Sequence, residues 1–247
     1  MATVYLKQDE NTVDTPMEMN STNSRFSDLP VPSLSNAQFE ELLNRLGGPS
    51  PTTIVPSVLG NPGPLGLAGF ALTTFMLSVF NAGSNLIDKE LEGVVLPVAL
   101  FYGGLAQFAA GMWEFRINNT FGATAFTSYG SFWMSFAGYV YFILPKIAST
   151  GKAKHATGLF LLSWFIFTLY MNIAAYKTSK LLFLLFVALN LTFLFLIIGN
   201  LADTSIITNI GGWFGIVTAV IAWYGSAAVV INVTWKRSLL PLGICKS

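Results

Sequence analysis

The segment NPGPLGLAGFALTTF, residues 61–75, combines a helix cap with two prolines at the start of an apolar stretch. Asn61 is a favoured capping residue, and Pro64 suits the first turn of a helix. The free N–H groups at such a helix end attract carboxylates. The segment therefore predicts either a place where an anion approaches the chain or only a well-capped helix that enters a bilayer.

A second unusual segment, FGATAFTSYGSFW at 121–133, places many hydroxyl groups inside another apolar stretch. Hydroxyl groups at membrane depth need hydrogen-bond partners or water. The uncharged polar side chains that the apolar stretches carry are Thr73, Thr74, Ser78, Asn81, Gln107, Thr124, Thr127, Ser128, Tyr129, Ser131, Asn172, Asn190 and Thr192. As a set they predict a weakly polar path through a helix bundle, although hydrogen bonds between helices explain any single one equally well.

Glu114 is the one carboxylate within a predicted span, two residues before Arg116. Charged groups inside membrane spans are rare and pair with other groups or serve transport. Glu114 is therefore predicted either to pair or snorkel at the membrane boundary, or to act as a gate or in a proton-linked step.

Residues for catalysis or metal binding are scarce. The chain has one histidine, His155, and one cysteine, Cys245, and it contains no HExxH, GxSxG or P-loop motif. We expect no enzyme, no metal site and no cofactor. The formal net charge of +1 also gives no basic field for a nucleic-acid partner.

The composition predicts an all-α membrane protein. Charged residues make up 10% of the chain and the mean hydropathy is +0.60, whereas soluble domains carry about 25% charged residues. Six apolar stretches, each close to the ~20 residues that cross a bilayer, lie near 64–83, 94–115, 123–143, 155–176, 181–199 and 212–232. Many glycines on these stretches favour close packing in a six-transmembrane-helix bundle.

The chain divides into a polar tail at 1–60, a membrane domain at 61–235 and a short C-terminal tail at 236–247. The first tail has the composition of a mostly disordered segment without a cleavable signal peptide, but 33–46 predicts a short amphipathic helix. Ser35 and Gln38 have the spacing of a capping box, and Gly47 and Gly48 form a stop. An even number of spans puts both termini on one side, and the Lys and Arg count, six against four, favours the cytoplasm.

Several long motifs in a fixed order resemble the acetate uptake transporter family, which includes bacterial succinate-acetate permeases and fungal acetate and ammonia export proteins. The motifs are NPGPLGLAGFALTTF, FYGGLAQFAAGMWEF at 101–115, NTFGATAFTSYGSFW at 119–133, and the shorter IGN at 198–200 and AWYGSAA at 222–228. The resemblance covers about 61–243. It implies a six-helix protomer with its own central pore, a ring-like homohexamer, and passage of acetate and related acids such as succinate.

The resemblance also implies site residues. An apolar constriction of the family aligns with Phe70, Tyr129 and Leu189. Polar positions that flank the path align with Asn61, Thr73, Gln107 and Thr124, and Leu65 and Thr127 complete the path-lining set. Gly225 stands where fungal relatives commonly have Asn, so a role for the last span is open.

The mechanism follows from the cost of burying charge. A carboxylate in a dry apolar neck meets a Born penalty of tens of kcal/mol in the idealised limit, whereas protonating an acid of pKa about 4.3 at about pH 6 costs roughly 2.3 kcal/mol. This favours the protonated acid, or the anion together with a proton. Conduction of the anion, ammonia or ammonium passage and a non-transporting acid sensor remain as alternatives.

Overall fold

The computed structural model describes residues 35–45, 59–83 and 87–243. Residues 58–247 form one compact unit, and the helix α1 (Asn36–Arg45) belongs to another, so α1 is described by itself. Gln38 Oε1 accepts a hydrogen bond from the Ser35 N–H at 3.0 Å, and Ser35 Oγ accepts one from the Gln38 N–H at 3.4 Å. The predicted stop at Gly47 and Gly48 lies outside the described residues.

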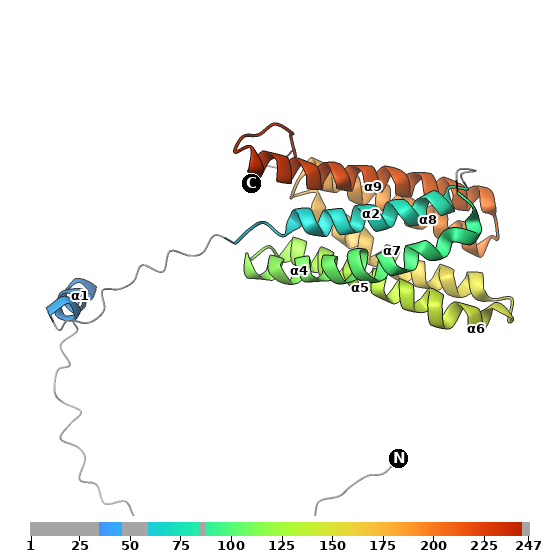
Figure 1. Ribbon diagram of the computed structural model, residues 1–247, viewed down its shortest axis with the longest axis horizontal. Helices are drawn as coiled ribbons and strands as arrows, with labels where there is room; N and C mark the ends of the chain where they lie inside the picture. The colour runs from blue at the N-terminus through green and yellow to red at the C-terminus, as the bar shows by residue number, and fades with distance from the viewer. Residues whose placement is uncertain (1–34, 46–58, 84–86, 244–247) are drawn as a thin grey trace, which may run out of the picture. The chain divides into compact units, whose positions relative to one another are not determined.

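The main unit is an antiparallel bundle of helices whose axes run back and forth along one direction (Figure 1). Two helical stretches of the bundle contain short pieces of other helical geometry. The second stretch contains the 3-10 helix η1 and the π-helix η2, and the third contains the π-helix η3. The elements are α2 (Gly63–Asn81), η1 (Lys89–Val94), α3 (Val95–Leu100), η2 (Phe101–Ala106), α4 (Gln107–Arg116), α5 (Thr120–Gly138), η3 (Tyr139–Ile143), α6 (Leu144–Ala148), α7 (Ala153–Ala175), α8 (Lys180–Leu201) and α9 (Ser205–Thr234).

Within the described residues, five helical stretches are long and apolar enough to cross a membrane, with mean hydropathies from 1.6 to 2.9. They are Gly63–Asn81, Lys89–Arg116, Ala153–Ala175, Lys180–Leu201 and Ser205–Thr234. The protein is therefore a helical membrane protein, as its composition predicts. The other predicted span, near 123–143, corresponds to α5 and η3 and is not among the five, because hydroxyl groups lower its mean hydropathy.

The helices close into a ring. Helix α2 packs on η2 and α4, α4 on α5, α5 on α7, α7 on α8, α8 on α9, and α9 on α2. The first and last helices of the bundle thus lie side by side, as Figure 1 shows for α2 and α9. A closed ring of helices can enclose a space along its axis, which is the requirement for a path through the membrane.

Glycines allow the helices to approach closely where the second helical stretch crosses its neighbours. A Cβ on Gly69 would lie 2.7 Å from the Tyr102 carbonyl oxygen in η2, and one on Gly130 would lie 2.6 Å from the Phe108 nitrogen. Small residues at such crossings let backbones touch, as the sequence predicts. They bring α2 against the π-helical segment η2 and α5 against α4.

The segment after α9 is also attached to the bundle. Asn232 Oδ1 accepts hydrogen bonds from the N–H groups of Leu239 and Leu240, and the Gly243 carbonyl accepts one from the Lys180 N–H. The chain end that the structure describes therefore lies against the start of α8.

Candidate functional site

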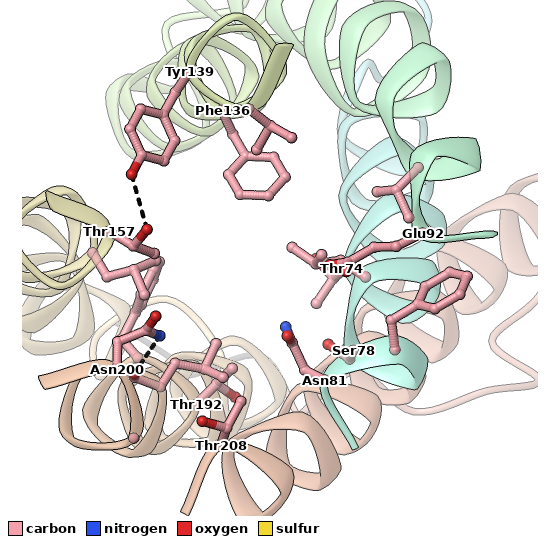
Figure 2. A pocket seen from close by; sticks show the side chains of 18 of the residues that line it. Thr74, Ser78, Asn81, Glu92, Phe136, Tyr139, Thr157, Thr192, Asn200 and Thr208 are labelled. Atoms are coloured by element: carbon pink, nitrogen blue, oxygen red, sulfur yellow. Dashed lines mark hydrogen bonds between the residues drawn. The ribbon is translucent and has the colours of Figure 1, made fainter. Parts of the chain in front are cut away.

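A cavity of about 950 Å³ lies inside the ring of helices and opens at one end of the bundle. We call this end the mouth end; here α2 and α8 end and α7 and α9 begin. The opposite end, where α2, α5 and α8 begin, is the cap end. Figure 2 shows the cavity as an open space bordered by side chains from several helices, many of them polar: Thr74, Ser78, Asn81, Glu92, Tyr139, Thr157, Thr192, Asn200 and Thr208.

Phe70, Tyr129 and Leu189 form the inner end of this cavity. On α2, α5 and α8 respectively, each of them is the lining residue furthest from the mouth end. All three are buried, with exposed fractions of 5%, 3% and 4%, and the Phe70 and Tyr129 rings meet edge to face at 5.6 Å. The three residues that the resemblance singles out are thus brought together from helices far apart in sequence. We refer to them as the neck.

Two unpartnered polar atoms lie one helical turn from the neck towards the mouth end. Thr74 follows Phe70 by four residues, Trp133 follows Tyr129 by four, and both line the cavity. In the described part of the chain, Thr74 Oγ1 and Trp133 Nε1 are buried and have no hydrogen-bond partner. Both atoms can donate a hydrogen bond to a carboxylate.

Two tyrosines of the lining make hydrogen bonds to threonines of α7. The Tyr129 hydroxyl lies 2.8 Å from Thr168 Oγ1, and the Tyr139 hydroxyl lies 2.9 Å from Thr157 Oγ1. The second pair is drawn with a dashed line in Figure 2. These bonds tie α5 to α7 at the level of the neck, and η3 to α7 near the mouth.

At the cap end, polar groups gather around Glu114, which is 1% exposed. Glu114 Oε2 accepts a hydrogen bond from Asn119 Nδ2 at 2.7 Å, and Asn119 Oδ1 in turn caps α5 by accepting one from the Gly122 N–H at 3.1 Å. A Cβ on Gly63 would lie 3.3 Å from Glu114 Oε1, and one on Gly122 would lie 2.9 Å from its carboxyl carbon. The carboxylate therefore lies at the first turns of both α2 and α5, where helix dipoles favour negative charge.

This position differs from pairing with Arg116 at the membrane boundary. Arg116 is exposed, and among the described residues Glu114 has no ion-pair partner. Asn61 Oδ1 accepts a hydrogen bond from the Gly63 N–H at 2.9 Å, although α2 begins one residue later than a cap at Asn61 requires. The anion beside this helix end is the protein's own Glu114.

The other predicted path residues lie outside the cavity lining. Asn61, Leu65, Thr124 and Thr127 lie on the cap side of the neck, whereas Thr73 follows Phe70 by three residues towards the mouth end. Thr73 is fully buried and donates a hydrogen bond to the Gly69 carbonyl at 2.9 Å. Gln107 Oε1 and Thr127 Oγ1 are buried without a partner in the part of the chain that the structure describes. Thr124 is half-buried, and Leu65 lies with Asn61 in an apolar depression between α2 and α9.

The sequence did not single out the charged and amide groups at the mouth. Glu92, Lys154, Asp203 and Asn200 line the opening, and Lys154 forms an ion pair with Asp203. Three of them stand at span ends or in loops, where charge is ordinary. Asn200 ends the IGN motif, which was the available signal for a lining position.

Comparison with known proteins identifies the family of the chain. The sequence profile described as the GPR1/FUN34/yaaH family matches residues 47–240. The chain belongs to the GPR1/FUN34/yaaH family. The resemblance that the motifs predict is thus confirmed.

Members of the GPR1/FUN34/yaaH family include relatives of known name. The chain is 39% identical to the succinate-acetate/proton symporter SatP of Escherichia coli (strain K12), over 75% of this chain and 96% of that protein. It is 41% identical to ammonia transport outward protein 2 of Saccharomyces cerevisiae, over 71% of this chain and 64% of that protein.

A solved structure, that of the bacterial acetate channel SatP, superposes with a TM-score of 0.67 at 39% identity. The superposition covers 75% of this chain and 99% of the channel. These relatives are named as a symporter, a transport protein and a channel, which are transport activities and not enzymatic ones.

Proposed function

We propose that the protein is a membrane transporter or channel for acetate and other short monocarboxylates. The observation that carries the proposal is the cavity of about 950 Å³ that ends on Phe70, Tyr129 and Leu189. Relatives named as a succinate-acetate/proton symporter and an acetate channel support the choice of substrate. The apolar neck fits a small molecule with a methyl group and sets the upper size limit.

We propose that α5 is a sixth membrane span. Its hydroxyl groups do not require contact with lipid, because Tyr129 and its neighbours towards the mouth line the cavity and α5 packs on α4 and α7. A helix that faces a cavity can cross a bilayer with a lower mean hydropathy than one that faces lipid. Oligomerisation as a homohexamer extends this proposal, and the many exposed apolar side chains of the bundle can face lipid or neighbouring copies.

The orientation follows from the basic residues. Arg116, Lys177, Lys180, Lys236 and Arg237 stand at the cap end, and Lys89, Lys146, Lys152 and Lys154 at the mouth end. The excess at the cap end puts both termini in the cytoplasm. The cavity then opens to the outside of the cell.

The path has two parts. In the cavity, the carboxylate lies beside Thr74 and Trp133, whose buried donors one turn before the neck lack a partner in the described structure and bind it once these side chains turn towards the cavity. The acid passes the neck in its protonated form, because an ionised carboxylate loses its hydration there. This makes transport proton-linked.

Beyond the neck, the acid meets the polar side chains of Gln107, Thr127 and Thr124 between α2, α4 and α5, while Thr73 flanks the path on the mouth side of Phe70. Gln107 Oε1 is an unpartnered acceptor and therefore suits a protonated acid, and the unpartnered Thr127 hydroxyl can donate or accept. Asn61 and Leu65 mark the exit. Glu114 closes the cap end by its hold on the first turns of α2 and α5, and its release opens the exit as a gate.

Ammonia export is the second candidate, favoured by the 41% identical ammonia transport outward protein 2 of yeast. A neutral ammonia molecule also passes an apolar neck, but it makes no use of the two hydrogen-bond donors of Thr74 and Trp133 that suit a carboxylate.

The experiment is uptake of labelled acetate by liposomes that contain the purified protein, measured against pH. At fixed total acetate, uptake should rise as the pH falls from about 7 towards 5, because the protonated fraction increases ~tenfold per pH unit in this range. Uptake equal to that of empty liposomes contradicts acetate transport. Alkalinisation by ammonium without acetate uptake identifies the ammonia alternative, and neither activity identifies a sensor.

A further inference from the structure

The neck contains a single polar atom, the hydroxyl oxygen of Tyr129, since Phe70 and Leu189 are apolar. Around the Tyr129 ring lie the rings of Phe70, Phe167 and Phe186, with centroids 5.6, 5.3 and 6.1 Å away. None of these groups can donate a conventional hydrogen bond. Whether the neck offers a donor to a passing carboxylate therefore depends on where the Tyr129 proton points.

The hydrogen bonds of Thr168 settle the direction. Thr168 Oγ1 lies 2.8 Å from the Trp164 carbonyl oxygen, which can only accept, so the threonine donates its one proton there. The 2.8 Å bond between Thr168 and Tyr129 must then run from the tyrosine hydroxyl to the threonine oxygen. The Tyr129 proton is turned away from the neck towards α7.

The same arrangement recurs nearer the mouth, which provides a matched control. Thr157 Oγ1 donates to the Ala153 carbonyl at 3.1 Å and therefore accepts from the Tyr139 hydroxyl at 2.9 Å. There, however, the cavity is wide, as the position of this pair at the edge of the open space in Figure 2 shows. A free tyrosine proton at that level does not decide which form of the acid passes.

Charged groups do not provide a substitute at the neck. The charged residues that line the cavity, Lys89, Glu92, Lys154 and Asp203, all belong to the mouth end. The titratable side chain near the neck is Tyr170 of α7, whose half-exposed ring packs on Phe167 at 5.1 Å. An anion at the neck thus meets neither a positive charge nor a donor.

We propose that Thr168, a residue outside the cavity lining, determines the specificity of the neck for the undissociated acid over the carboxylate anion. Because Thr168 accepts the hydrogen bond from the Tyr129 hydroxyl, the neck is left without a free hydrogen-bond donor. An anion then loses its hydration without a replacement, whereas a neutral acid does not carry a charge that needs one. This inference rests on the proposed function, because it assigns a role to the neck in acid transport.

The test separates the two forms of the acid. Labelled acetate uptake into liposomes is measured at equal pH on both sides, with the concentration of undissociated acid held constant while the pH is raised from about 5 to about 7. The anion then increases ~tenfold per pH unit, while the neutral acid does not change. The wild-type rate should stay constant across the series.

In Thr168→Val the Tyr129 proton loses its acceptor and becomes available to a carboxylate in the neck. The rate should rise with pH, at least severalfold over the series. Thr168→Ser keeps the acceptor and should behave as the wild type. Tyr129→Phe also leaves the neck without a donor, so its uptake rate, whatever its size, should not depend on pH. The uptake rate of the control Thr157→Val should not depend on pH either.

The double variant Thr168→Val/Tyr129→Phe separates this account from a loosened bundle. If the released proton admits the anion, removing the hydroxyl restores the constant rate; a rate that still rises with pH overturns the inference. A constant rate in folded Thr168→Val also overturns it, while wild-type uptake shows that the proposed function stands. Should Thr168→Val fail to fold, Tyr129→Phe decides alone, because a pH-dependent rate in that variant contradicts a neck without a donor.

Discussion

The two ends of the bundle handle polar groups in opposite ways. At the mouth end, hydroxyl and amide side chains border an open cavity of about 950 Å³ and many of them face its space. At the cap end, Glu114, Asn119 and Asn61 bond to one another or to helix ends, and Glu114 is 1% exposed. Polar groups at the mouth are thus available to a substrate, whereas those at the cap end hold helices together.

Removing the Glu114 carboxylate from the cap end should have the largest effect on this difference between the two ends. In Glu114→Leu, Asn119 Nδ2 loses its acceptor and the first turns of α2 and α5 lose a negative charge, which we expect to destabilise the bundle by about 2–4 kcal/mol. Glu114→Gln keeps an acceptor and should lose less. Thermal unfolding in mild detergent measures the difference.

The control is Glu92→Leu, which removes a carboxylate from the mouth end. Glu92 lines the cavity and is only partly buried, so its loss should change stability by less than about 1 kcal/mol. Equal destabilisation by the two leucine variants would show that the ends do not differ in this way.

Truncating the side chains of the neck should widen it and change substrate selectivity more than the stability of the bundle. Leu189→Ala and Phe70→Ala should each raise the ratio of succinate to acetate uptake about tenfold, because one or more methylene groups at a tight contact set ~1–3 kcal/mol of discrimination. The ratio is measured in liposomes and normalised to folded protein. Lactate should gain in the same way.

Leu185→Ala is the matched control for Leu189→Ala. Leu185 lies one turn away on α8 and is 3% exposed, but it does not line the cavity. Its truncation should cost the usual ~2–5 kcal/mol of a buried leucine and leave the ratio unchanged. If Leu185→Ala shifts the ratio as much as Leu189→Ala, the size limit does not reside at the neck.

The smallest expected effects distinguish Asn119, the cap of α5, from Asn61, which accepts one hydrogen bond just before α2. Asn119→Ala removes both the cap of α5 and the donor to Glu114, so it should cost about 1–2 kcal/mol, whereas Asn61→Ala removes one bond to Gly63 and should cost about 1 kcal/mol or less. Asn61→Ala should weaken acetate uptake without preventing membrane insertion. Unfolding and uptake are compared in the same preparation, and unchanged uptake would leave Asn61 with a structural role alone.

The helical fold followed from composition and from apolar stretches of membrane length, and the capping box of α1 and the position of Pro64 in the first turn of α2 from local residue types. The cap predicted at Asn61 was wrong, because Pro62 is the capping residue of α2, and the cap of α5 at Asn119 was not predicted. Such features depend on a few neighbouring residues. The hydroxyl-rich stretch near 123–143, which the sequence analysis predicts as a span, stays a prediction, because it is not among the five described stretches that are apolar enough to cross a membrane.

What the sequence missed depends on contacts between distant helices. The free end of α2 suggested a place for a substrate carboxylate, but packing of α4 against α2 and α5 places Glu114 there. Thr168 carried no signal, because its bond to Tyr129 joins α7 to α5 across 39 residues. The π-helical segments η2 and η3 were also not predicted, because the pattern of apolar residues along these stretches does not distinguish π from α geometry.

The most direct test of the account is acetate uptake by liposomes that contain either the wild type or Leu189→Trp. The larger ring should fill the space beside the Phe70 and Tyr129 rings at the inner end of the cavity, while both ends of the bundle remain intact. We predict uptake that rises with acidity for the wild type, and uptake at the level of empty liposomes for the folded variant. Equal uptake by the two proteins would contradict passage of the acid through the neck.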